Sequence, residues 1–245
     1  FPYTTLFRSQ GAGRAEHRGP HVNRVPMSLS VDLYWSFRSP YSYLAAQRLA
    51  GLRQSYVFDV NVKIVRPLAV RDPDFFERGD PRWLHYVLID APREAERMGL
   101  PMSAPNPDPI EQDLTTRAIA AEQPRIARLN RLGVRACELG DGLLYIAAAS
   151  QRIWGPDPEA VSWSTPGELD EAAHIAGVPP EALERDIAAE ADRLDAVLIA
   201  NEREQDAAGH WGVPLMMFGG EPFFGQDRID ALLWRMRSAG LHPHR

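Results

Sequence analysis

The amino-acid sequence predicts an α/β fold in which a large all-helical segment interrupts a small sheet core. Two β-rich runs, 31–37 and 58–64, flank a helical pattern near the amino end. Near the carboxyl end, two apolar runs on either side of Gly219-Gly220 precede another amphipathic helix. Residues 82–206, between these parts, show helical spacing broken by Pro and Gly. We therefore assign residues 29–68 and 209–239 to the core and residues 69–208 to a helical insertion domain.

The first part of the core has the order strand, helix, strand. Residues 31–37 are rich in β-branched and aromatic side chains, which favour a strand. Pro40 suits a first helical turn, because its missing N–H needs no partner there. The apolar residues that follow at helical spacing are Leu44, Ala45, Leu49 and Leu52. Residues 58–64 alternate between apolar and polar, so this unit predicts two parallel strands joined by a right-handed crossover.

The middle of the chain has the pattern of successive helices. We expect helices over 83–98, 111–139 (with a break near Pro124 or Gly133), 142–153, 166–176, 180–189 and 191–208. Thr165-Pro166-Gly167-Glu168 has the form of a capping box with Pro in the first turn, so we place a helix start there. Residues 99–109, "GLPMSAPNPDP", contain four prolines and predict extended surface chain near or over a cleft.

The closing part of the core has the order strand, strand, helix. Residues 212–218 and 221–224 are apolar runs, and the Gly-Gly pair between them is a hairpin signal. Residues 226–237 then carry four large apolar side chains on one helical face.

Composition and charge limit the functions that this chain can have. A net charge of −6 with a single lysine, Lys63, argues against a nucleic-acid partner, because binding phosphates needs a basic face. No apolar run reaches 18 residues, so we expect no membrane-spanning helix. Cys137 is the single cysteine, which excludes a disulfide or a two-thiol motif within the chain. The histidines show no compact ligand spacing, and we expect no metal site.

Residues 1–26 do not resemble the rest of the sequence. They show no sustained hydrophobic period and lack the basic start, apolar core and cleavage site of a secretory signal. We interpret them as a non-native or disordered extension, with Met27 as the true start, and we expect a cytoplasmic protein.

Ser39-Pro40-Tyr41-Ser42 opens the first helix and is the first of three segments with chemical potential. Free N–H groups and the helix dipole at such an end stabilise an anion such as a thiolate. Ser39 has two interpretations, a hydrogen-bond donor to that anion or a helix cap only. We place Ser42 on the exposed surface of the helix.

The other two segments lie near the carboxyl end. Pro214, after Val213, removes a ladder donor at the start of a strand, so it is either functional or an edge-strand proline. Gly225 permits a tight turn before Gln226. Asp227 and Arg228 offer the two charges that an amino-acid head group needs, or serve as a favourable cap.

Taken together, "YWSFRSPYSYLAAQRL" and "WGVPLMMFGGEPFFGQDRIDAL" resemble the 2-hydroxychromene-2-carboxylate isomerases. These belong with the kappa-class glutathione transferases in the DsbA-like thioredoxin superfamily. The resemblance, which extends in element order over about residues 29–236, implies a thioredoxin-like core with the helical domain inserted into it. It implies glutathione as cofactor, with Ser39 beside the sulfur and Val213, before a cis Pro214, paired with the cysteinyl backbone. Gly225, Gln226, Asp227 and Arg228 then hold the γ-glutamyl end.

The resemblance further implies reversible addition of the glutathione thiolate to a conjugated carbon of a small aromatic-derived acid. A homodimer is also implied. Two other functions stay open on the residues: a glutathione transferase acting on another electrophile, and a DsbA-like protein that binds peptides without catalysis. The aromatic residues that we expect in the substrate wall are Trp35, Trp83, Tyr86 and Trp211.

One region departs from the resemblance. Relatives often carry Asn and Lys after the second strand and near the next helix start, whereas this chain has no lysine there. Arg66, Arg82 and His85 are possible replacements, although each also fits a surface residue or a partner on a helix face.

Overall fold

The structure, a computed structural model, describes residues 29–113, 115–116, 118–156 and 161–244. The interpretation of residues 1–26 lies outside the described residues. The strands are β1 (Leu29–Trp35), β2 (Phe58–Ile64), β3 (Leu215–Phe218) and β4 (Glu221–Phe224). The helices before residue 140 are α1 (Pro40–Ser55), α2 (Leu68–Arg71), α3 (Phe75–Arg78), α4 (Pro81–Arg97) and α5 (Pro124–Leu139). The later helices are α6 (Gly142–Trp154), α7 (Asp170–Ile175), α8 (Pro180–Ala189), α9 (Ala191–Ala207), the 3₁₀ turn η1 (Gln226–Arg228) and α10 (Ile229–Ser238).

Strand β1 lies between β2 and β3 in the sheet. The core therefore contains strands from both the amino-terminal and the carboxyl-terminal parts of the chain. The strand order is β2-β1-β3-β4, with β2 parallel to β1 and with β3 and β4 antiparallel to their neighbours. Val31, Leu33 and Trp35 point into the main hydrophobic core, while Tyr34 packs on the opposite face with Val65 and Leu215. Both faces of β1 are therefore covered, and the predicted parallel unit and hairpin are confirmed.

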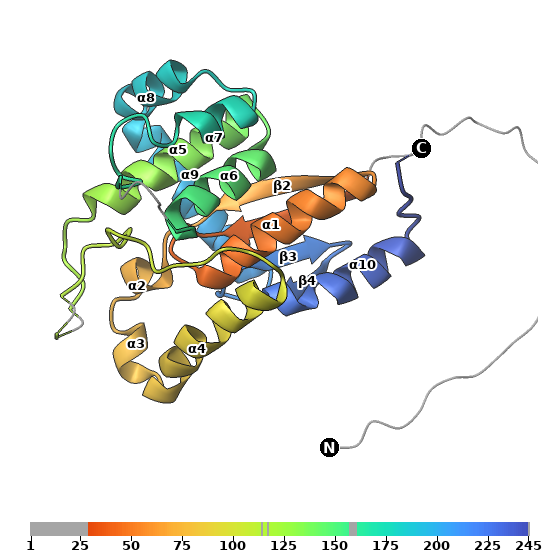
Figure 1. Cartoon of the computed structure of the whole chain (residues 1–245), viewed down its shortest axis with the longest axis horizontal. Coiled ribbons are helices and arrows are strands. Elements are labelled where there is room, and N and C mark those ends of the chain that lie inside the picture. Colours follow the sequence, from red (N-terminus) through yellow and green to blue (C-terminus); the bar gives the residue numbers. More distant parts are fainter. Residues whose placement is uncertain (1–28, 114, 117, 157–160, 245) are drawn as a thin grey trace, which may run out of the picture.

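The helices between β2 and β3 form two groups (Figure 1). Helices α5 to α9 gather around the end of β2, and α5, α6 and α9 each contact that strand. Helices α2, α3 and α4 form a second group at the lower left of the view. Helix α10 lies beside the hairpin and contacts β3 and β4. The predicted α/β fold with inserted helices is confirmed.

Two predicted helix starts are wrong, and proline and glycine explain both. The helix expected from residue 111 begins at Pro124, because proline lacks the N–H that would continue a preceding helix. Gln112 and Ile119 instead form an isolated antiparallel bridge. The helix expected from Pro166 begins at Asp170, because Gly167 takes φ +90° and breaks the helical path. The four-residue helices α2 and α3 were not predicted, since so short a segment shows no period.

The close contact between the end of α5 and the end of α7 predicts a stability effect. A Cβ on Gly140 would lie 2.3 Å from the carbonyl oxygen of Ala176. We expect Gly140→Ala to lower the free energy of unfolding by about 1–3 kcal/mol, measured by urea denaturation. Gly51, in α1, has nothing within 4 Å of the same position, so Gly51→Ala is the matched control and should stabilise by about 0.5–1 kcal/mol. Equal effects of the two substitutions would contradict this packing.

Candidate functional site

A cavity of about 870 Å³ opens where the start of α1, helices α2 and α4, and the segments around β3 and β4 meet. Its size suits a small organic ligand. The structure brings most of the predicted site residues to this one cavity. Those that line it are Ser39, Trp83, Tyr86, Trp211, Val213, Gly225, Gln226, Asp227 and Arg228.

Ser39 lies half-buried at the mouth of α1 and acts as its N-cap. Its Oγ accepts a hydrogen bond from the backbone N–H of Ser42 at 3.2 Å, so the capping interpretation is confirmed. The backbone N–H of Ser39 donates a hydrogen bond to the carbonyl of Ser36. The hydroxyl hydrogen is not needed for the cap, and Ser39 lines the cavity. Ser39 therefore caps the helix and still has a proton to donate to an anion in the cavity.

Two predictions about residues near this turn are wrong. Trp35 is 0% exposed, packs edge-on against Phe37 and donates from Nε1 to the carbonyl of Ser42 at 2.7 Å. It belongs to the core and does not line the cavity, because β1 turns this side chain toward α1. Ser42 is also fully buried, not on the helix surface as expected, and its Oγ has no hydrogen-bond partner among the described residues.

The Val213–Pro214 bond is cis, as the resemblance implied. Pro214 itself is buried and does not line the cavity, while Val213 does. Gly212 is held on both sides, because its N–H donates to His210 Nδ1 at 2.8 Å and its carbonyl accepts from Gln205 Nε2 at 2.8 Å. Burial lowers the pKa of His210, which keeps Nδ1 free to accept this bond. In the described part of the chain the N–H and C=O of Val213 make no hydrogen bond.

The segment from Gly225 to Arg228 is tied to the same place. Gly225 takes φ +101°, a conformation that favours glycine, and its N–H donates to the carbonyl of Pro214 at 2.9 Å. Gln226 is buried, and its side chain already bridges Arg48 and Glu94. Asp227 and Arg228 are exposed and lie 3.6 Å apart.

Gln226 therefore orders the turn through its side chain, and the two charged residues keep their head groups available in the cavity.

Three of the predicted aromatic residues form the outer wall. Trp83, Tyr86 and Trp211 are 48%, 55% and 44% exposed. Phe75, from α3, packs against Trp211 with 4.8 Å between ring centroids and meets Trp83 edge-on at 6.3 Å. Tyr86 donates to Asp90 at 3.0 Å. A flat apolar ligand would find exposed ring surface here.

Sequence reasoning missed several polar side chains that line the cavity, among them Tyr41 and Arg71. Tyr41, directly after Pro40, donates to Asp90 at 2.8 Å, and burial together with this bond raises the pKa of its phenol. Arg71, the last residue of α2, also lines the cavity. The three residues proposed as replacements for the absent lysine do not: Arg66 pairs with Glu202, Arg82 pairs with Asp80, and His85 is exposed. Arg71 follows closely after the second strand in the sequence, but the four-residue helix that carries it to the cavity has no recognisable sequence pattern.

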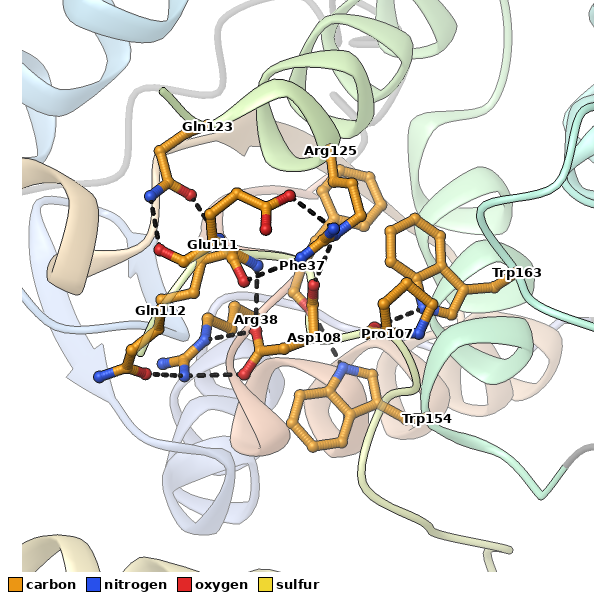
Figure 2. Close-up of polar contacts among 11 residues, drawn as sticks. Phe37, Arg38, Pro107, Asp108, Glu111, Gln112, Gln123, Arg125, Trp154 and Trp163 are labelled. Carbon is orange, nitrogen blue, oxygen red and sulfur yellow. Dashed lines mark hydrogen bonds and ion pairs between the residues drawn. The ribbon is translucent and has the colours of Figure 1, made fainter. Parts of the chain in front are cut away.

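The proline-rich loop, residues 99–109, forms an ion pair with Arg38 in the turn before Ser39 (Figure 2). Arg38 donates from Nε and Nη2 to the two carboxylate oxygens of Asp108, at 2.8 and 2.9 Å, and also to Gln112. Trp154 donates to the carbonyl of Phe37 at 2.9 Å. Arg125 in turn holds the carbonyl of Asp108. The loop has no regular secondary structure, as expected, but none of it lines the cavity; it fixes the turn from the other side.

The chain's single cysteine does not take part in this site. Cys137 lies in α5, and burial raises the pKa of its thiol to about 12, so the thiol stays protonated at neutral pH. A thiolate in the cavity would have to arrive with a ligand. Among the described residues no cluster of His, Cys, Asp or Glu could hold a metal ion, and no helix there is long and apolar enough to cross a membrane.

The arrangement of a capped helix start beside a cis proline defines a thioredoxin-type site. The family model described as the DSBA-like thioredoxin domain matches residues 30–237, and the chain belongs to this family.

Two curated relatives are named 2-hydroxychromene-2-carboxylate isomerase. The protein from Pseudomonas putida is 27% identical over 214 residues, which cover 82% of this chain and 91% of the relative. The protein from Pseudomonas sp. (strain C18) is 28% identical over 213 residues, covering 82% and 87%.

Solved structures support the fold. A 2-hydroxychromene-2-carboxylate isomerase superposes with a TM-score of 0.59 at 23% identity, covering 86% of this chain and 96% of the other. The cytosolic disulfide reductase DsbM from Pseudomonas aeruginosa with GSH superposes with a TM-score of 0.51 at 16% identity, covering 85% and 100%.

Proposed function

We propose that this chain is a glutathione-dependent isomerase of the 2-hydroxychromene-2-carboxylate type. The observation that carries the proposal is the convergence of Ser39, the backbone of Val213 and the Gly225–Arg228 turn on one cavity. The two curated relatives named for this activity match over most of the chain. The single cysteine lies away from the cavity with a protonated thiol, which favours a thiol brought by a ligand. The structure of DsbM, which has a similar fold, was solved with GSH.

In the proposed reaction the glutathione thiolate adds to a conjugated carbon of the acid. A C–S bond forms while the π electrons move to the carbonyl oxygen, so the former double bond becomes single and rotates. Elimination then breaks the C–S bond, restores the double bond and returns glutathione unchanged. The chain contributes a hydrogen bond from Ser39 to the thiolate and the positive end of α1, and the residues around Val213 and Arg228 hold the tripeptide.

The test is an assay of the full chain with 2-hydroxychromene-2-carboxylate, followed by absorbance with and without glutathione. We expect turnover to require glutathione, and a glutathione concentration far below that of the substrate to suffice. The total thiol concentration should be unchanged at the end. A mixture with glutathione but without protein is the control for uncatalysed addition. Isomerisation that proceeds without glutathione would contradict the proposal. Loss of thiol in step with substrate would instead identify a glutathione transferase.

A further inference from the structure

Arg71 is a cation at the cavity that has no anionic partner among the described residues. Its Nη1 donates to the amide oxygen of Gln205 at 3.1 Å, and its Nη2 donates to the carbonyl of Trp211 at 2.9 Å. Both acceptors are neutral. The Nε atom is buried and has no hydrogen-bond partner among the described residues. A guanidinium has five N–H donors, so this side chain is held in place with donors to spare.

The other charged side chains of the cavity differ from Arg71. Arg38 is paired bidentately with Asp108. Glu94 accepts from Arg97 and Gln226, and Asp90 accepts from Tyr41 and Tyr86. Arg228 is exposed beside Asp227.

The acids that act on Arg71 electrostatically are Glu202 and Asp206. Glu202 already accepts three hydrogen bonds from Arg66, and neither acid forms an ion pair with Arg71 in the described part of the chain. Burial lowers the pKa of Arg71, although a guanidinium stays protonated at neutral pH.

The surroundings of Arg71 indicate what its partner is. Trp211, whose carbonyl accepts a hydrogen bond from Arg71, presents an exposed ring to the cavity; Phe75 packs against that ring, and Trp83 packs edge-on against Phe75. Ser36 also lines the cavity, is buried, and its Oγ has no hydrogen-bond partner in the described chain. A cation with unused donors next to flat aromatic surface fits a flat ring that carries a carboxylate.

We propose that Arg71 binds the carboxylate of an aromatic acid and thereby orients the electrophilic substrate in the cavity. The proposal rests on the proposed function for the identity of the reaction, but acid binding itself does not depend on turnover. A bidentate contact from a guanidinium fixes direction as well as position, so the ring is held against the aromatic wall with its conjugated carbon presented to the thiolate. In this role Arg71 takes the place of the lysine that relatives often carry in this region and that this chain lacks.

The experiment is a calorimetric titration of the full chain with chromone-2-carboxylate, a stable bicyclic aromatic acid, and with its uncharged carboxamide. The variants are Arg71→Gln and Arg71→Lys, and Arg82→Gln is the matched control because Arg82 is exposed and outside the cavity. We expect wild type to prefer the acid over the amide. Arg71→Gln should weaken acid binding by about 10- to 100-fold and leave amide binding unchanged. Arg71→Lys should recover part of the loss, and Arg82→Gln should match wild type.

Glutathione is titrated separately to distinguish the two sources of a carboxylate. Unchanged glutathione affinity in Arg71→Gln supports the proposal, whereas selective loss of glutathione binding overturns it, because Arg71 then holds the tripeptide. Equal binding of acid and amide by wild type, or unchanged acid binding by Arg71→Gln, also overturns it. If Arg71→Gln does not fold, Arg71→Lys gives the answer: the acid-to-amide preference must fall, since lysine cannot make the two-donor contact. Acid binding that responds as expected while isomerisation is absent would contradict only the proposed function.

Discussion

Ser39→Ala is expected to lower the proposed glutathione-dependent isomerisation at pH 7 by about 10- to 30-fold, because a thiol with the ordinary pKa of about 8.5 is only about 3% ionised at that pH. The hydroxyl favours the thiolate, so its loss raises the pKa of bound glutathione toward the value of about 8.5 for a free thiol. Below both pKa values the variant is therefore slower at every pH. Above about pH 9 glutathione ionises unaided and the two rates converge. The measurement is the pH profile of kcat/KM for wild type and variant.

The cap that Ser39 provides must be separated from its role toward the thiolate. Ser39→Ala also removes the acceptor for the Ser42 N–H, at a cost of about 1 kcal/mol in stability. Ser39→Asp keeps that acceptor, lacks the donor and adds a repelling charge, so it should be as stable as wild type and less active than Ser39→Ala. Ser42→Ala is the matched control, because Ser42 Oγ is buried without a partner in the described chain. Full activity in Ser39→Asp would remove Ser39 from the mechanism.

Trp35→Ala is expected to lower the free energy of unfolding by about 3–5 kcal/mol, because it opens a cavity in the core beneath β1. It also leaves the Ser42 carbonyl without the indole donor. For a chain of this size the loss corresponds to a fall in Tm of roughly 6–20 °C by calorimetry. Trp234→Ala, at a side chain that is 60% exposed on α10, is the control and should change stability by less than about 1 kcal/mol. Similar effects of the two substitutions would show that Trp35 is not a core residue.

The parts of this molecule that the sequence predicted are those with a local signal. Alternation in residues 58–64 and the glycine pair at 219–220 reflect period-2 burial and turn geometry. The strand over 58–64 and the hairpin turn lie where expected, although the first hairpin strand begins at Leu215 and not at residue 212. The helix at Pro180–Ala189 was predicted to the residue. At 111–123, apolar residues at helical spacing misled, because the preference of Pro124 for a helix start decided the boundary.

The site was predictable in its backbone but not in its polar partners. Ser39, Val213 and Gly225 sit at turns whose chemistry can be read from one short segment each. The side of the strand on which Trp35 lies depends on register with two distant strands, and no local pattern fixes it. Arg71 belongs to a four-residue helix, and its lack of an anionic partner within the described part of the chain is a property of the packed structure.

The position of β1 between β2 and β3 has a consequence for the order in which the protein is made. Ser39 leaves the ribosome more than 170 residues before Val213, which at 5–20 residues per second is a delay of roughly 10–35 s. During that time the turn at α1 has neither the Val213 strand nor the Gly225 turn beside it. Pairing of β1 with β3 closes a long loop and is a late folding event. A nascent chain therefore lacks a complete cavity until the segments around Val213 and Gly225 have been made and β3 has paired with β1, and the proposed glutathione binding requires that pairing.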